Sequence, residues 1–211
     1  HIGTDRLASA VKRIRDKTIS LGGEVYFGAN VTEIVHRKGA VAAVRYLKGG
    51  KVFEQPADNI ILAIGHSARD TFERLIIDGV HMEQKPFSVG VRIEHPQKLI
   101  DKIQYGDFAG NPLLGAADYR MVLHLPNGRN VYTFCMCPGG RVVAATSEEN
   151  RLLTNGMSLY ARDGNNANTA LLVTVKSEDL GSEDPLAGVV YQRGIEEAAF
   201  TAGGGGYRAP V

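Results

Sequence analysis

The chain has 211 residues, 44% of them hydrophobic and 22% charged, which is enough to bury a core as one large domain or two small ones. Its 24 Lys and Arg nearly balance its 23 Asp and Glu, and no basic run occurs, so the composition argues against nucleic acid and anionic membranes as partners. No apolar run approaches the roughly 20 residues of a membrane span, and the N-terminus lacks the pattern of a signal peptide. We therefore expect a cytoplasmic protein with no membrane partner.

The first part of the chain mixes helix and strand patterns. Apolar residues at near-helical spacing predict a helix over residues 4–21, which ends at Gly22 and Gly23. Alternating patterns and glycine turns then predict strands over residues 24–35, 40–47 and 52–57. The run NIILAIG, residues 59–65, is continuously apolar, which is typical of a strand covered on both faces in a parallel sheet.

From Lys85 onward the predicted strands are longer and are joined by tight turns. Residues 87–94 alternate between apolar and polar, which predicts a strand with one buried face. The polar side of this strand carries Ser88, Arg92 and Glu94, and it is either the wall of a substrate cleft or a solvated strand face.

The last hundred residues contain strong turn signals. Residues 119–146 are typical of an antiparallel meander, with turns at Asn127-Gly128 and at Pro138-Gly139-Gly140. An apolar strand at residues 171–175 and a helix from Pro185 to about Ala202 complete the pattern. The glycine segments PGGR, residues 138–141, and TNGMS, residues 154–158, either place backbone amides near a ligand or are ordinary turns.

The junction after the apolar run is a candidate ligand site. Gly65 precedes a helix in which Ser67 and Asp70 have the spacing of a capping box, and the helix ends at Gly79. The free N–H groups of such a helix, at the carboxyl end of a strand, bind anions such as a diphosphate in open α/β sheets. A plain strand–helix turn with a serine cap explains the same pattern, so these residues alone leave both interpretations open.

Seven blocks spread over the chain resemble a known family. They are HIGTD, AIGHSARDTF, KPFSVGVRIEHPQ, LGAADY, YTFCMCPGG, TNGMS and GYRAPV. Together they resemble the bacterial family of uncharacterised FAD-dependent dehydrogenases, which are two-domain, glutathione-reductase-like flavoproteins. In that family the resemblance implies an upstream GxGxxG fingerprint and a downstream Gly-Asp motif, and this sequence has neither. Because the chain also starts at His1 rather than at a methionine, we expect it to be the central portion of such a protein.

The resemblance implies an α+β fold in three parts. Residues 1–84 would be an incomplete Rossmann-like FAD-binding layer, residues 85–202 a strand-rich inserted domain for a substrate or partner, and residues 203–211 a return linker. The cofactor implied is FAD of the parent protein. Because the fingerprint that holds most of the diphosphate is missing, we do not expect this chain alone to retain FAD.

Five residues are implied as cofactor contacts. The resemblance places Val31 beside the adenine, and it places Ala63, Gly65, His66 and Ser67 beside the diphosphate and ribose. Without the resemblance, Val31 reads as a plain core valine and His66 as a solvated loop histidine. No residue is assigned a catalytic role.

The implied function is that of an FAD-dependent oxidoreductase, a dehydrogenase whose small-molecule substrate is unknown. NAD(P)H or another electron donor is the expected partner, and the isolated chain is expected to be inactive. The competing hypothesis is a module that binds a ligand or partner on a nucleotide-like scaffold, without redox activity.

Cys135 and Cys137 allow three interpretations. They are structural thiols, a dithiol coupled to the flavin, or joint metal ligands, because residues two apart on a strand share a face. A metal site normally needs a second close pair of ligands or a helical His pair, and neither occurs, so no metal is predicted. A disulfide across a single residue is strained.

Overall fold

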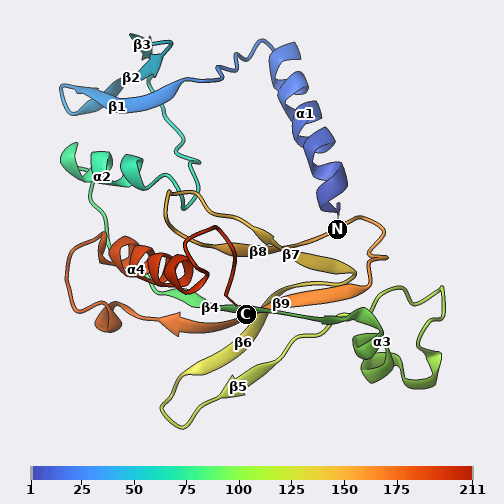
Figure 1. The fold of residues 1–211 in the computed structure, drawn as a ribbon. Helices are drawn as coiled ribbons and strands as arrows, with labels where there is room; N and C mark the ends of the chain where they lie inside the picture. Colours follow the sequence, from blue (N-terminus) through green and yellow to red (C-terminus); the bar gives the residue numbers. More distant parts are fainter. Residues whose placement is uncertain (1, 211) are drawn as a thin grey trace.

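A computed structural model describes residues 2–210 as a mixed α+β fold, which confirms the predicted class at this level (Figure 1). The helices are α1 (Thr4–Ser20), α2 (Arg69–Ile77), α3 (Gln97–Tyr105) and α4 (Ala187–Ala202), with short 3-10 turns η1 (Gly106–Phe108) and η2 (Ser177–Asp179). The strands are β1 (Asn30–Arg37), β2 (Ala40–Lys48), β3 (Lys51–Pro56), β4 (Phe87–Pro96), β5 (Val122–His124), β6 (Asn130–Cys137), β7 (Gly140–Ala144), β8 (Thr154–Ser158) and β9 (Asn166–Val175). Within residues 2–210, none of the helices combines the length and apolar character that a membrane span requires.

The N-terminal helix forms where the sequence predicts it, but its apolar stripe is uncovered. No side chain of α1 is buried, and Leu7, Val11 and Ile14 are 48%, 57% and 68% exposed. A helix in water is stabilised mainly by packing of such a stripe. Among the described residues, this apolar face of α1 is not covered by another element.

The first sheet is an antiparallel meander of β1, β2 and β3. Its first strand starts only at Asn30, so the predicted strand over residues 24–35 is too long at its N-terminal end. Arg45 in β2 pairs with Glu33 in β1 at 2.6 Å and with Glu54 in β3 at 2.9 Å. These cross-strand pairs join all three strands on one face.

The predicted strand over residues 59–65 is absent. This segment has no regular secondary structure, and Ile61 in its middle is 92% exposed. A strand in a parallel sheet takes its hydrogen bonds from its neighbours, and the described residues place no strand in register with this segment. The segment therefore has the composition of a covered strand without the strands that would cover it.

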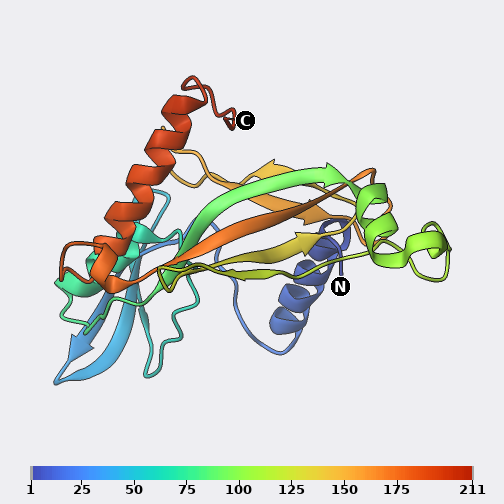
Figure 2. The same cartoon turned by 90° about the horizontal axis from the view of Figure 1, so that it is seen from below.

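The second sheet forms the centre of the molecule, with strand order β4, β9, β6, β5. β4 and β9 are paired over their whole length, from Phe87 opposite Val175 to Pro96 opposite Asn166. Figure 2 shows α3 and α4 at opposite ends of this long pair. Ala167 to Ala170 of β9 are all buried, so β9 is the central strand of the core.

The predicted meander is divided between two sheets. The turn at Asn127-Gly128 closes the β5–β6 hairpin, as predicted. After the turn at Pro138 and Gly139, however, β7 pairs with β8 in a separate two-stranded sheet that packs against the central one. The turn was predicted correctly, but a turn does not determine which strand the segment after it pairs with.

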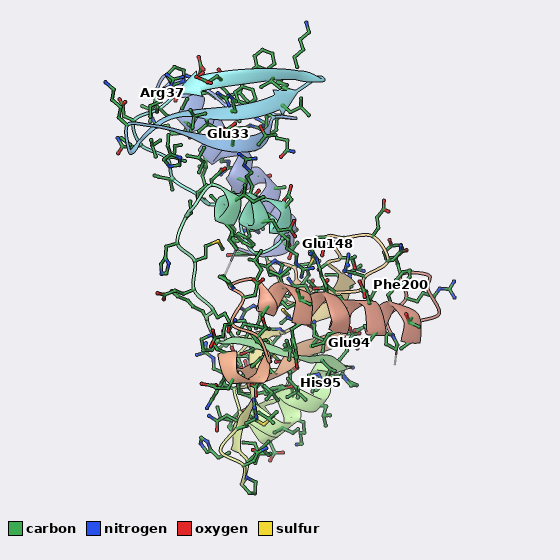
Figure 3. The ribbon with its side chains drawn as sticks, turned by 90° about the vertical axis from the view of Figure 1, so that its left-hand side faces the viewer. Glu33, Arg37, Glu94, His95, Glu148 and Phe200 are labelled. Carbon is green, nitrogen blue, oxygen red and sulfur yellow. The ribbon has the colours of Figure 1, made fainter. Side chains whose placement is uncertain are left out.

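A largely buried ion-pair network joins α2 to α4, and Figure 3 labels one of its members, Glu148. Arg69, at the start of α2, is 3% exposed and donates to Glu196 of α4 at 2.7 Å and to Gln192 at 3.3 Å. It also bonds Glu148, which follows β7 and is in turn held by Arg193 at 2.8 Å. This network joins residues before and after Lys85 through charged groups that are largely removed from water.

The same network predicts acid sensitivity. The hydrogen bonds from Arg193, followed by those from Arg69, lower the pKa of Glu148 from its ordinary 4.5 to about 2. A carboxylate with a lowered folded-state pKa stabilises the fold fully above about 4.5, and this contribution is lost as pH falls toward about 2. Urea unfolding between pH 7 and pH 2 should therefore show wild type losing stability more steeply than Glu148→Gln below about pH 4.5.

The neighbouring Glu149→Gln variant is the matched control, because Glu149 has no ion pair among the residues described. Its pH profile should run parallel to that of the wild type. If Glu148→Gln also ran parallel to wild type through this range, the carboxylate of Glu148 would not be held by the two arginines in solution.

Candidate functional site

A pocket of about 470 Å³ opens where the N-terminal end of α1 meets the β7–β8 sheet. It is lined by Thr4 and Asp5 of α1, residues 139–141, residues 157–159 and residues 164–166. Small-molecule sites commonly enclose roughly 300–1,000 Å³. The pocket is thus large enough for a small substrate or one ring system.

Glycines form much of the pocket wall because neighbouring backbones touch there. A Cβ on Gly139 would lie 2.1 Å from the carbonyl oxygen of Arg162, and one on Gly140 would lie 2.2 Å from that of Met157. A Cβ on Gly164 would lie 2.3 Å from the Gly139 carbonyl oxygen. Since only glycine fits such approaches, the backbones of these segments pack directly against one another at the pocket wall.

The polar groups of the pocket are partly committed to the fold and partly available. Thr4 Oγ1 donates to the Ser158 carbonyl at 3.3 Å, and Asp5 Oδ1 accepts from the Tyr160 N–H at 2.8 Å, so both tie α1 to the end of β8. Ser158 is 8% exposed, and its hydroxyl has no hydrogen-bond partner among residues 2–210. The exposed guanidinium of Arg141 likewise has no ion pair within the described chain.

Two side chains near the end of β4 hold the pocket in place. The buried Gln97 accepts the Gly139 N–H through its side-chain Oε1 at 2.8 Å, and its backbone N–H donates to the Asn165 carbonyl at 2.8 Å. Glu94 accepts from Asn166 Nδ2 at 2.6 Å. β7 and β8 contact the polar side of β4, where Glu94 also accepts the Val142 N–H at 2.8 Å and remains exposed, so this side is partly covered and partly solvated.

The predicted cofactor residues lie elsewhere. Val31 is in β1 and is 43% exposed, and Ala63, Gly65 and His66 belong to the irregular exposed segment before α2. None of the five lines the 470 Å³ pocket. Ala63, Gly65, His66 and Ser67 lie close together only because they are near one another in the sequence.

The predicted capping box does not form. Ser67 Oγ lies 2.8 Å from His66 Nδ1, and α2 begins at Arg69 with Ala68 at the N-cap and no side-chain cap. Gly65 has a φ of +69°, and nothing lies within 4 Å of the position of an added Cβ. The backbone at this corner is open to a ligand.

The pocket is lined by two segments whose role at a ligand site the sequence left undecided, and by others that the sequence analysis did not predict. The segments PGGR and TNGMS, which are far apart in sequence, meet at its wall. Sequence reasoning missed the contributions of Thr4, Asp5 and residues 164–166. The available signals were the HIGTD block and the dense Gly and Asn content of the loop before β9.

The two cysteines sit at different depths. Cys135 is exposed and Cys137 is buried, although they are two residues apart in one strand. Residues 2–210 contain no cluster of three or more His, Cys, Asp or Glu side chains that could hold a metal ion.

Comparison with known proteins identifies the family. Residues 86–211 match a family model described as FAD-dependent protein, C-terminal domain-like, which covers more than half of the chain. The chain belongs to this family. An uncharacterised protein of Clostridium beijerinckii is 50% identical over 212 residues, which cover 100% of this chain and 39% of that protein. The chain thus spans about 39% of the length of this relative.

Proposed function

We propose that this chain is the central portion of an FAD-dependent dehydrogenase. The observation that carries the proposal is membership of an FAD-dependent family over residues 86–211. In this proposal residues 1–84 belong to an incomplete Rossmann-like FAD layer, residues 85–202 form the inserted domain, and residues 203–211 return toward the layer. A small-molecule substrate and NAD(P)H or another electron donor are the partners that such a function requires.

The corner before α2 fits part of FAD. The first hydrogen bond of this turn is from Thr71 N–H to the Ala68 carbonyl, so the N–H groups of Ala68, Arg69 and Asp70 precede it. Such groups and the helix dipole favour an anion, and Gly65 allows its close approach. We assign the diphosphate and ribose to Ala63, Gly65, His66 and Ser67, and the adenine to Val31.

When bound, FAD supplies the redox chemistry, while the protein binds and orients the reactants. The 211 residues contain no GxGxxG fingerprint, so the remaining diphosphate contacts come from other parts of the longer protein. We place the substrate in the 470 Å³ pocket, where Arg141 and Ser158 are available to bind an anionic or polar group.

The exposed surface supports a covered position in a larger protein. The chain exposes 14,572 Å², whereas a compact protein of its mass, 22.8 kDa, exposes roughly 9,600 Å². The exposed surface includes the apolar stripe of α1 and the apolar residues Ile61, Leu62 and Ile64 of the segment before α2. We assign the cover of these surfaces to the remaining polypeptide of the full-length protein.

The test starts from the full-length protein, which should be yellow and show flavin absorbance bands. In that protein, Gly65→Ala should weaken FAD binding by about tenfold or more, because the added methyl group blocks the diphosphate from the backbone. The measurement is the dissociation constant of FAD, from quenching of flavin fluorescence by the apoprotein.

Gly128→Ala is the matched control. Gly128 has a φ of +78°, and nothing lies within 4 Å of its added Cβ, so the variant carries similar backbone strain at the β5–β6 turn. It should bind FAD like the wild type. Equal affinities for the two variants would remove Gly65 from the site, and a colourless full-length protein that takes up no FAD would favour the module that binds without redox activity.

A further inference from the structure

The strand that carries both cysteines is interrupted by a β-bulge. Phe134 pairs with Ala170 of β9, but the next pair is Cys137 with Asn168, so β6 has one extra residue between them. Cys135, within this bulge, has a φ of +49°. Of the five described non-glycine residues with left-handed φ, it alone lies inside a strand.

Such a conformation is uncommon for a residue other than glycine, and bulges often re-aim side chains beside functional sites. In a regular strand Cys135 and Cys137 would point to the same face at the same depth. The bulge instead leaves Cys135 exposed while Cys137 is buried. An exposed thiol next to a protected one is the arrangement of an attacking cysteine and a resolving cysteine.

The Cys137 thiol and the Arg92 guanidinium meet at the backbone carbonyl of Cys135. Cys137 Sγ lies 3.4 Å from the Cys135 carbonyl oxygen, and Arg92 Nη1 donates to the same oxygen at 3.4 Å. Burial raises the pKa of the Cys137 thiol, and the adjacent Cys135 thiol raises it further, while Arg92 acts in the opposite direction. Arg92 thus favours the thiolate of Cys137, which is the nucleophile in the second step of an exchange.

We propose that Cys135 and Cys137 form a redox-active dithiol that exchanges with disulfides of small thiols. The pair lies directly before the Pro138-Gly139 turn of the 470 Å³ pocket, so it is placed at the edge of the candidate substrate site. This inference rests on the two thiols themselves and does not depend on the presence of a flavin.

The exchange proceeds in two balanced steps. Cys135 Sγ, as the thiolate, attacks one sulfur of the external disulfide; a mixed disulfide forms, the external S–S bond breaks, and one small thiolate leaves. Cys137 Sγ then attacks Cys135 Sγ, and the second small thiolate leaves. The pair loses two electrons and the external disulfide gains two, while the two cysteine protons pass to solvent and the leaving thiolates.

A disulfide across one residue is strained, which raises its reduction potential. The oxidised pair should therefore be reduced readily by small thiols. A structural disulfide would resist such reduction, so an easily reversed bond is the result that the proposal requires.

The test equilibrates the full-length protein with mixtures of reduced and oxidised glutathione, followed by acid quenching, alkylation with N-ethylmaleimide and trypsin digestion. One tryptic peptide, residues 130–141, contains both cysteines, because Arg129 and Arg141 flank it. Mass spectrometry should show this peptide doubly alkylated in reducing mixtures. In oxidising mixtures it should be unalkylated and lighter by two hydrogen atoms, and dithiothreitol should reverse the change.

Single variants separate the roles of the two thiols. Cys137→Ser should stop at a mixed disulfide of glutathione on Cys135, whereas Cys135→Ser should leave Cys137 largely unmodified because it is buried. A wild-type peptide that stays doubly alkylated in every mixture, or that carries glutathione independently on each cysteine, would overturn the proposal.

Discussion

Replacing Arg69 with methionine is expected to destabilise the protein by about 3–5 kcal/mol, the usual cost of removing one partner from a buried ion pair. Arg69 is 3% exposed, and it is the α2 member of the network that includes Glu196 and Glu148. Without the guanidinium, Glu196, itself 8% exposed, would keep a charge in a site with little water. The fold would lose the contact that fixes α2 on α4.

The matched control for this variant is Arg37→Met. Arg37 pairs with Glu54 at 2.7 Å, but its side chain is 64% exposed, so its loss should cost less than about 1 kcal/mol. The measurement is the free energy of unfolding in urea for both variants and for the double variant Arg69→Met with Glu196→Gln. The double variant should recover part of the loss, and equal costs for the two single variants would show that the Arg69 network does not hold α2.

Replacing Gly139 with alanine should be similarly damaging, at about 3 kcal/mol, for reasons of space and backbone conformation. Gly139 has a φ of +59°, and the added Cβ would lie 2.1 Å from the backbone carbonyl oxygen of Arg162. A backbone atom cannot rotate away as the end of a side chain can, so the Gly139 turn or the loop at Arg162 must shift. Because Gly139 and residues 164–166 line the same pocket, this shift should also disrupt the pocket.

Gly128→Ala separates the two contributions. Gly128 has a left-handed φ of +78° without any neighbour within 4 Å of the added Cβ, so its variant measures strain alone, about 1–2 kcal/mol. Unfolding free energies of the two variants give the cost of the close approach by difference. If Gly139→Ala cost no more than Gly128→Ala, the close contact with Arg162 would not exist in solution.

Local patterns in the sequence predicted the elements that local forces determine. The helical spacing over residues 4–21 became α1, the Asn127-Gly128 turn became the β5–β6 hairpin, and the pattern after Pro185 became α4. α4 begins at Ala187, two residues after the predicted start at Pro185, and its N-cap Leu186 has no side-chain cap; Asp184 Oδ1 accepts the Leu186 N–H at 2.7 Å in the turn before the helix. Helix periodicity, caps and tight turns involve residues close in sequence, so they can be recognised there.

These local patterns could not predict which strands pair with each other. Residues 59–65 have the apolar run of a covered strand, yet the strands that would pair with them are not among the described residues. Strand pairing depends on hydrogen bonds between distant segments, and an apolar run by itself does not contain them. The same reason explains why β7 leaves the predicted meander and pairs with β8.

The sequence by itself determined the mixed α+β class, the glycine segments PGGR and TNGMS, and a resemblance that the match to an FAD-dependent family supports in part. Only the tertiary structure shows that these glycine segments meet the N-terminal end of α1 at a pocket. It also shows that a β-bulge leaves Cys135 exposed and Cys137 buried. The physical reason is that backbone contacts and strand register join residues far apart in the chain. Composition and spacing describe each segment alone, whereas the site exists only where those segments touch.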